Sequence, residues 1–347
     1  MTIGVIDGAP SSRRHAGARR AVARFDLSLS ENPFPPLPSV LHAVNVEMAR
    51  SNRYPEFLPH RLPALVAARL GIDADQVVVG AGATGVAMQI IQALTTHGDE
   101  LVTSTPTFDG YPIMADMAGL RLVPVPLDSS GAQDLSAMRR AVTKRTKLVV
   151  VCRPHNPTGT VVTSGELRGF LSAVPNGVPV VLDEAYVEFL ADPDQLDTTA
   201  LLRKHSNLIV LRTFSKAYGL AGLRIGYAFG GRELMARIRR LQLPFGMGTA
   251  AVAAVAASYA AATELGERVR RITTARELLR DTLLADGLSV PRSHANFLYL
   301  PGPGIATALR RAGITAKCYP DGSARIAVGD PAADHAVLTA LRARPTR

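Results

Sequence analysis

One lysine stands apart from the other basic residues of this sequence. Only five residues are lysines, at positions 144, 147, 204, 216 and 317, and arginine is the common basic residue. Lys216 lies in "RTFSKAYGLAGLRIGYAFG", between Ser215 and a segment of Ala, Gly and Leu, directly after the apolar run "NLIVL". The amine of a lysine can form a Schiff base with an aldehyde, so Lys216 is the first candidate for a chemical role.

The segment "GAGATG" indicates a phosphate site. Gly80, Gly82 and Gly85 fit the spacing G-x-G-x-x-G between an expected strand and an expected helix. Glycines at such a turn let a phosphate approach the helix N-terminus, whose free N–H groups and dipole favour an anion. NAD-binding domains share this spacing, but here the next strand ends in "TSTP" without the acidic residue that binds the ribose. A plain tight turn remains the structural alternative, and an NAD-dependent dehydrogenase remains the weaker enzymatic one.

Polar residues follow two further apolar runs. Asn156 follows "KLVVVC" in the segment "RPHNPTGT", and Asp183 ends "VPVVLD", with Tyr186 three positions later. Ligands bind at the carboxyl edge of an open α/β sheet, where both side chains would lie. Taken alone, Asn-Pro-Thr-Gly is a turn and an aspartate can cap a helix. Because both residues follow strands in the same way, we expect them to share one site.

Together these groups fit pyridoxal 5′-phosphate. A lysine amine can bind its aldehyde, and a carboxylate can hold its pyridine nitrogen protonated, because a nearby opposite charge raises the pKa of that nitrogen. Asn and Tyr can bind the phenolic oxygen. A glycine loop, Ser and Thr hydroxyls and an arginine can hold the phosphate.

Alternating strand and helix patterns from about residue 75 to 230 predict an α/β fold, with a mostly parallel central sheet and helices on both faces. The runs "NLIVLRTF" and "RIGYAFG" are too close for a helical crossover, so they are either not neighbours or antiparallel. After Pro244 the pattern predicts a smaller α+β domain. We therefore expect an N-terminal arm and part of the small domain over residues 1–50, with "ENPFPPLP" extended, a large cofactor-binding domain over 51–245 and a small C-terminal domain over 246–347.

Composition excludes several other classes of protein. The 347 residues carry a formal net charge of +10, but the arginines form no stripe with interleaved aromatics, so we expect no nucleic-acid partner. Cys152 and Cys318 lie in no disulfide or metal-binding spacing, which predicts no metal site. The arginines of "SSRRHAGARR" precede a polar segment, unlike an export signal, and no apolar run reaches the roughly 18 residues that span a bilayer. The sequence predicts a cytoplasmic protein without a membrane partner.

The order and approximate spacing of several segments resemble the fold-type I pyridoxal-phosphate aminotransferases. The resemblance is to the histidinol-phosphate and aromatic amino acid (phenylalanine) aminotransferase branch, and it covers about residues 25–335. The Lys216 segment is its most specific part, and the glycine loop is its least specific. The segments that carry it are "AGATG", "PTF", "HNPTGT", "DEAY", "RTFSKAYGLAGLRIGY", "ANF" and "ARIAVG".

The resemblance implies roles for the residues at matching positions. Lys216 would bind the cofactor and move the substrate proton, Asp183 would bind the pyridine nitrogen, and Phe108 would stack on the ring. The matching residues for the phenolic oxygen are Asn156 and Tyr186. Those for the phosphate are Ala83, Thr84, Thr213, Ser215 and Arg224.

The resemblance also implies substrate contacts and a homodimer. Arg325 in "SARIAVG" would bind the substrate α-carboxylate through its bidentate fork, and Asn32 would close over the substrate. Tyr54 in "RYPE" would reach the phosphate of the neighbouring subunit.

The chain departs from the family pattern at several positions. "RPHNPTG" places Arg153 and His155 where the pattern usually reads "NPNNPTG", and Ser30 replaces a common asparagine. Lys317 stands where histidinol-phosphate enzymes usually have an arginine that contacts the substrate phosphate. A lysine can bind phosphate as a point charge, so Lys317 weakens the histidinol-phosphate interpretation without excluding it.

We expect an aminotransferase that moves an amino group from an aromatic amino acid to a 2-oxo acid such as 2-oxoglutarate. The alternative is a histidinol-phosphate aminotransferase of histidine biosynthesis. A lyase or decarboxylase on the same fold is a weaker alternative. The sequence leaves open the preferred donor and acceptor, and how Arg153, His155 and Lys317 affect them.

Overall fold

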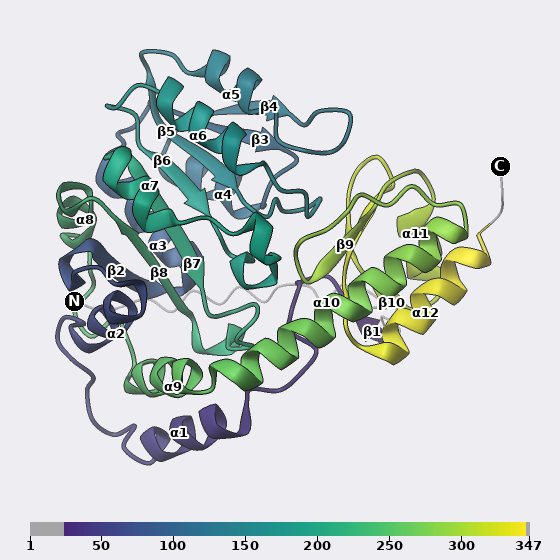
Figure 1. Ribbon diagram of the computed structural model, residues 1–347, viewed down its shortest axis with the longest axis horizontal. Coiled ribbons are helices and arrows are strands. Elements are labelled where there is room, and N and C mark those ends of the chain that lie inside the picture. Colours follow the sequence, from purple (N-terminus) through teal and green to yellow (C-terminus); the bar gives the residue numbers. More distant parts are fainter. Residues whose placement is uncertain (1–23, 345–347) are drawn as a thin grey trace, which may run out of the picture.

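The computed structural model describes residues 24–344, so the segment "SSRRHAGARR" lies outside the described residues. Figure 1 shows a large lobe around one sheet and a small lobe at the C-terminal end. The large sheet has the strand order β2-β8-β7-β6-β5-β3-β4. Its strands are β2 (Val77–Ala81), β3 (Glu100–Thr105), β4 (Arg121–Pro126), β5 (Thr146–Cys152), β6 (Val180–Asp183), β7 (Leu208–Thr213) and β8 (Ile225–Gly230).

Strand direction in this sheet follows from the lengths of the connections. β8 runs antiparallel to both of its neighbours, β2 and β7, and the other pairs are parallel. The short Lys216 segment therefore joins two antiparallel neighbours, which decides between the two alternatives that the sequence left open. The other strands are joined by helices, because a parallel connection must cross back over the sheet.

The central strands are apolar on both faces because helices cover both. In β5, Val149 and Val151 belong to one hydrophobic cluster, whereas Leu148 and Val150 belong to another on the opposite face. One face is covered by α3 (Gly82–Leu94), α4 (Gly110–Met117) and α8 (Arg232–Arg239). The other is covered by α2 (Arg61–Leu70), α5 (Leu135–Ala141), α6 (Ser164–Ala173), α7 (Thr198–Lys204) and α9 (Thr249–Ala260). This arrangement confirms the predicted α/β class.

The prediction of an extended segment over the first fifty residues is wrong for α1 (Pro38–Met48), which packs against α9. Pro38 stands in the first turn of this helix, where its fixed φ and missing N–H cost nothing. The prolines of "ENPFPPLP" therefore lead into a helix. Residues between β1 (Phe25–Asp26) and α1 have no helix or strand.

The small lobe has its own hydrophobic core. A three-stranded antiparallel sheet, β11-β12-β9, packs with three helices, and β1 pairs in parallel with β10. Leu27 lies in this core, so the N-terminal segment crosses to the small lobe. The elements are α10 (Ala262–Ala285), β9 (Phe297–Leu300), α11 (Ile305–Arg311), β10 (Ile314–Thr315), β11 (Lys317–Cys318), β12 (Ala324–Ala327) and α12 (Pro331–Arg342).

α10 links the two lobes, as Figure 1 shows. The preceding helix, α9, contributes Ala254 and Val255 to the core of the large lobe, whereas Ile272 of α10 belongs to the core of the small lobe. The predicted domain boundaries at residues 50 and 245 stay a prediction. Four short 3-10 helices complete the fold: Ala74–Gln76, Val187–Phe189, Asp192–Asp194 and Ala221–Leu223. Within residues 24–344, no helix has the length and apolarity needed to cross a membrane.

Candidate active site

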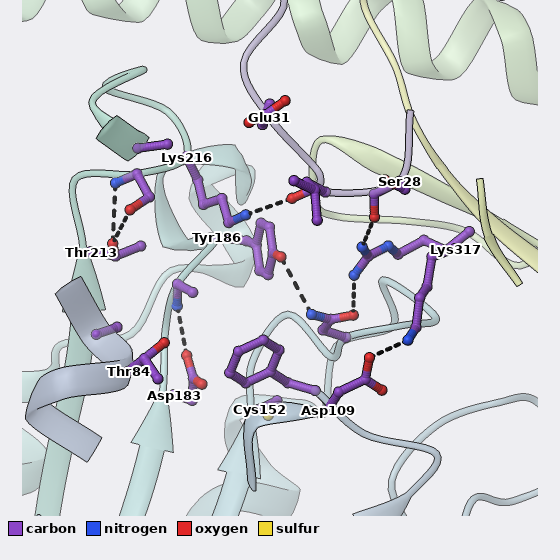
Figure 2. A pocket seen from close by; sticks show the side chains of 18 of the residues that line it. Ser28, Glu31, Thr84, Asp109, Cys152, Asp183, Tyr186, Thr213, Lys216 and Lys317 are labelled. Carbon is purple, nitrogen blue, oxygen red and sulfur yellow. Dashed lines mark hydrogen bonds and ion pairs between the residues drawn. The ribbon is translucent and has the colours of Figure 1, made fainter. Parts of the chain in front are cut away.

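A pocket of about 610 Å³ lies at the carboxyl edge of the large sheet and is closed on one side by the small lobe (Figure 2). Its lining brings together most of the residues predicted from the sequence. These are Ala83, Thr84, Phe108, Asn156, Asp183, Tyr186, Thr213, Ser215, Lys216, Arg224, Lys317 and Arg325. Asn32 and Tyr54 are the predicted site residues outside this lining.

Lys216 extends into the pocket from the connection between β7 and β8. Its Nζ donates hydrogen bonds to the backbone oxygens of Leu29 (3.1 Å) and Ser30 (3.2 Å). Burial, and to a smaller extent the charge of Arg325, lowers the pKa of Lys216 to about 8. The lowered pKa increases the fraction of neutral amine near neutral pH, which is the form that attacks an aldehyde or accepts a proton.

Asp183 lies at the end of β6 with its carboxylate held on both oxygens. Oδ2 accepts a hydrogen bond of 2.6 Å from the hydroxyl of Tyr111, and Oδ1 accepts one of 3.0 Å from the backbone N–H of Ala185. Burial raises the pKa of the Asp183 carboxyl, although both hydrogen bonds lower it. The carboxylate thus has a fixed orientation in a site where a cationic partner would stabilise its charge.

Tyr111 is the residue that sequence reasoning missed. It lies on α4, is only 2% exposed, and packs in the same cluster as Met114 and Ala115. From its spacing it reads as an ordinary core residue of a helix. The signal that could have identified it is its polar hydroxyl, since a buried tyrosine hydroxyl needs a hydrogen-bond partner.

The N-terminus of α3 and the side chain of Arg224, which precedes β8, form a cradle suited to an anion. α3 begins at Gly82, whose φ of 76° suits glycine, and a Cβ atom there would lie 2.3 Å from Nη2 of Arg224. The hydroxyl of Thr213 donates a 3.0 Å hydrogen bond to the hydroxyl of Ser215 beside them. Free N–H groups, hydroxyls and a guanidinium converge here, as a phosphate requires.

Arg325 of β12 approaches from the small lobe. Nη1 donates to Oδ1 of Asn156 (2.7 Å), and Nη2 donates to the backbone oxygen of Ser28 (2.6 Å). Nε is buried without a hydrogen-bond partner among the described residues. Asn156 also donates to the hydroxyl of Tyr186 at 3.5 Å. Burial raises the pKa of Tyr186 to about 12, so its phenol stays protonated and can donate.

Asn32 does not line the pocket but hydrogen-bonds the backbone at Lys216. Its Nδ2 donates to the backbone oxygens of Lys216 (3.1 Å) and Ala217 (2.9 Å). The neighbouring backbone is held as well, since Asn296 donates to the backbone oxygens of Ser30 and Glu31. The predicted contact between Asn32 and a substrate stays a prediction.

Tyr54 lies on the surface and is 82% exposed. Its ring centroid lies 4.7 Å from that of Phe245, whose ring also contacts Phe57 at 5.1 Å. Both phenylalanines are exposed, so these three residues form an aromatic surface cluster. Tyr54 therefore does not reach the pocket.

The two departures in "RPHNPTG" are buried outside the pocket lining. Nε of Arg153 donates to the backbone oxygen of Val162 at 2.9 Å, and Nη2 donates to that of Asp194 at 2.6 Å. His155 hydrogen-bonds Thr158 at 2.8 Å, and burial lowers its pKa to about 3, so the ring is neutral. Both side chains stabilise the loop that presents Asn156.

Lys317 and Asp109 form an ion pair at the mouth of the pocket, as Figure 2 shows. Lys317 comes from β11 of the small lobe, and Asp109 precedes α4 of the large lobe. Lys317 therefore lies in the pocket as predicted, and the carboxylate of Asp109 compensates its charge. Within residues 24–344, no cluster of three or more His, Cys, Asp or Glu side chains could hold a metal ion.

Comparison with known proteins identifies the family. Residues 24–341 match the family described as aminotransferase class I and II. This chain belongs to that family. The aromatic amino acid aminotransferase of Cutibacterium acnes is 42% identical to this aminotransferase over 341 residues, covering 97% of this chain and 96% of the relative. The protein of the same name from Streptomyces coelicolor is 41% identical over 339 residues, covering 96% and 94%.

Solved structures support the same fold. The histidinol-phosphate aminotransferase of Sinorhizobium meliloti, in complex with pyridoxal-5′-phosphate, matches this aminotransferase with a TM-score of 0.86 at 28% identity, covering 92% of this chain and 90% of that one. The family resemblance, the fold class and the transaminase class predicted from the sequence are confirmed. These relatives favour transamination over the NAD-dependent alternative. The roles of individual site residues stay predictions.

Proposed function

We propose that this aminotransferase uses pyridoxal 5′-phosphate to move an amino group from an aromatic amino acid to a 2-oxo acid such as 2-oxoglutarate. The observation that carries the proposal is the convergence of Lys216, Asp183 and the α3 cradle on one pocket. The cradle fits a phosphate, since the guanidinium of Arg224 lies against the N-terminus of α3, where a Cβ atom at Gly82 would collide with it. The lysine with a lowered pKa fits an aldehyde.

The cofactor-binding side chains each have a matching partner on the cofactor. Pyridoxal phosphate, when bound, supplies an electron sink for the α-carbon of the substrate. The Asp183 carboxylate would hold the proton on the pyridine nitrogen, and Asn156 and Tyr186 would donate to the phenolic oxygen. Phe108 would cover the ring. The phosphate would bind Ala83, Thr84, Thr213, Ser215 and Arg224.

Lys216 and Arg325 would act on the substrate itself. The neutral amine of Lys216 would accept the proton from the α-carbon and return it during the second half of the reaction. Arg325 would bind the α-carboxylate that amino acids and 2-oxo acids share, because its fork can donate two parallel hydrogen bonds. Its buried Nε, without a partner among the described residues, supports this role.

Two observations favour an aromatic donor. The relatives with about 41% identity are named aromatic amino acid aminotransferases. Tyr319 lines the pocket beside Lys317, where it offers apolar surface to a ring. Histidinol phosphate remains the second candidate, because Lys317 lies at the same mouth and the structural match from S. meliloti carries that name.

A panel of donors tests the proposed function. The cofactor-loaded protein is mixed with phenylalanine, tyrosine or histidinol phosphate, and loss of the absorbance of the lysine-bound cofactor is followed in single half-reactions. We expect kcat/KM to be highest for an aromatic amino acid. A preference for histidinol phosphate would establish the alternative, and the absence of amino transfer with every donor would contradict the proposal.

We also infer a cytoplasmic homodimer with shared sites. The exposed cluster of Tyr54, Phe57 and Phe245 offers apolar surface to a second copy, and Tyr54 would there reach the phosphate cradle of the partner subunit. Light scattering of the purified protein tests the dimer. A monomeric protein that retains full activity would contradict it.

A further inference from the structure

The ion pair between Lys317 and Asp109 joins the two lobes across the opening of the pocket. Both residues line the pocket, and their side chains are 35% and 53% exposed. The Lys317 amine also lies 6.0 Å from the centre of the Tyr319 ring. Tyr319 also lines the pocket, so this ion pair borders the apolar surface proposed for the aromatic substrate.

The register of the small sheet fixes where Lys317 lies relative to the substrate. Lys317 of β11 is paired with Arg325 of β12. Directly opposed residues on antiparallel strands have neighbouring side chains on one face, with Cβ atoms about 5 Å apart. If Arg325 binds the α-carboxylate, Lys317 lies beside it, within reach of a group on the substrate side chain.

Apart from Lys317, each cation that lines the pocket has a binding partner under the proposed function. Lys216 binds the cofactor, Arg224 its phosphate and Arg325 the α-carboxylate. Among the described lining residues, Lys317 is the cation left for an anionic side chain. Its charge, however, is compensated by Asp109.

We propose that Asp109 is a specificity-determining residue that neutralises Lys317 and disfavours substrates with an anionic side chain. This inference rests on the proposed function and names the feature that selects uncharged, aromatic side chains within it. An anionic group that approached Lys317 would have to displace the Asp109 carboxylate or lie beside it, and the two negative charges repel each other. A neutral ring incurs no such penalty.

The same penalty applies to the acceptor, because both substrates of a ping-pong reaction use one site. 2-Oxoglutarate carries a second carboxylate, whereas phenylpyruvate does not. Removal of the Asp109 charge should therefore lower KM for 2-oxoglutarate and leave KM for phenylpyruvate nearly unchanged.

Equilibrium binding of two substrate-like carboxylates tests the proposal without turnover. Glutarate carries a distal carboxylate and 3-phenylpropanoate carries a ring, and calorimetry gives Kd of each for the cofactor-loaded protein. In Asp109→Asn we expect glutarate to bind about fivefold more tightly, the scale of a partly exposed charge pair, with 3-phenylpropanoate changed by less than about twofold. The Asp109 side chain caps no helix N–H, so the variant should fold normally.

Two further variants isolate the effect. Asp116→Asn removes the same charge from an exposed position of α4 outside the pocket lining, and should leave both Kd values unchanged. The double variant Asp109→Asn/Lys317→Gln should lose the gain for glutarate. The proposal is overturned if Asp109→Asn behaves like Asp116→Asn, or if the gain persists without Lys317.

Turnover separates this inference from the proposed function. In Asp109→Asn, kcat/KM for histidinol phosphate should rise relative to that for phenylalanine. If the wild-type protein transfers no amino group from any donor, the proposed function fails, but the two Kd values still decide whether Asp109 sets the charge preference of the pocket.

Discussion

The two sides of the pocket are built differently. The cofactor side consists of Ala83, Thr84, Asn156, Asp183, Thr213, Ser215, Lys216 and Arg224, which lie at the ends of strands and helices of the large lobe. The substrate side consists of Ser28, Leu29, Lys317, Tyr319 and Arg325, which come from the N-terminal segment and the two-residue strand β11, its following turn and β12. The first side is fixed by the seven-stranded sheet, whereas the second combines the short strands of the small lobe with an N-terminal segment that has no helix or strand after β1.

This difference separates the reaction from its specificity. A sheet with apolar residues on both faces holds its strand ends in one arrangement, so the groups proposed to bind the cofactor need no adjustment for each substrate. The N-terminal segment is held through Arg325, which donates to the backbone oxygen of Ser28, and through Asn296. Changes on the cofactor side should therefore abolish the reaction with every substrate, and changes on the substrate side should alter selection among substrates.

The largest effect is expected at Lys216. In Lys216→Ala the protein loses both the covalent link to the cofactor and the base that moves the substrate proton, so kcat should fall by more than about 10³-fold for all donors. The measurements are the absorbance of the lysine-bound cofactor and kcat with phenylalanine. Thermal unfolding should show that the fold is retained.

Lys204→Ala is the matched control, because Lys204 is exposed at the end of α7 and does not line the pocket. It should keep normal absorbance and turnover. Substantial transamination by Lys216→Ala would contradict the assignment of this lysine.

A smaller and more selective effect is expected at Arg325. Arg325→Ala removes the partner of the α-carboxylate and leaves Asn156 without its 2.7 Å hydrogen bond. The free-energy barrier that determines kcat/KM should therefore rise by roughly 2–5 kcal/mol in both half-reactions, with amino acids and with 2-oxo acids. Arg325→Lys keeps the charge without the fork and should recover part of the loss. Histidinol phosphate has no α-carboxylate, so its half-reaction should be reduced less.

Arg310→Ala provides the comparison, since Arg310 is exposed on α11 of the same lobe. It should not change either half-reaction. Equal losses with phenylalanine and histidinol phosphate in Arg325→Ala would show that Arg325 supports the pocket without selecting the carboxylate.

The sequence predicted which residues of the large lobe meet in the pocket, because these residues lie at or shortly after the ends of strands. Asn156 and Asp183 follow apolar runs whose ends must meet at one edge of a sheet, and Gly82 begins a helix where a phosphate can bind. Lys216 was visible because a lysine is unusual among Ala, Gly and Leu. In each case, the residues next to the functional residue in the sequence indicate where it lies in the fold.

The substrate side depends on contacts that the sequence does not encode locally. Nothing in the residues around Asp109 indicates that Lys317, 208 positions later, compensates its charge. The hydrogen bond from Asn32 to the backbone of Lys216, 184 positions later, is likewise absent from any local pattern. The sequence predicts an extended segment where α1 forms, because Pro38 at the start of this helix belongs to the proline-rich "ENPFPPLP". These features follow from how the lobes pack against each other.

A smaller effect than at Lys216 or Arg325 is expected at Tyr111. It tests whether the proposed cofactor side also depends on Tyr111, which hydrogen-bonds the Asp183 carboxylate without lining the pocket. Tyr111→Phe removes the 2.6 Å hydrogen bond to Asp183 and should reduce kcat about tenfold with little change in KM. That hydrogen bond lowers the pKa of Asp183, against the effect of burial, so its removal should raise this pKa further. Because the ionised carboxylate is the form that stabilises a protonated pyridine, activity on the acid side should be lost at a higher pH than in the wild type.

A pH profile of kcat distinguishes this positioning role from simple loss of packing. Tyr299→Phe removes a comparable 2.7 Å contact, to Ser323 in the small lobe, and should leave the acid limb of the profile unchanged. If the acid limb of Tyr111→Phe also stays in place while thermal stability falls, Tyr111 serves only the core of the large lobe. If the acid limb of Tyr111→Phe moves to higher pH while thermal stability is unchanged, Tyr111 influences the charge state of Asp183. The proposed cofactor side then includes a residue that does not line the pocket.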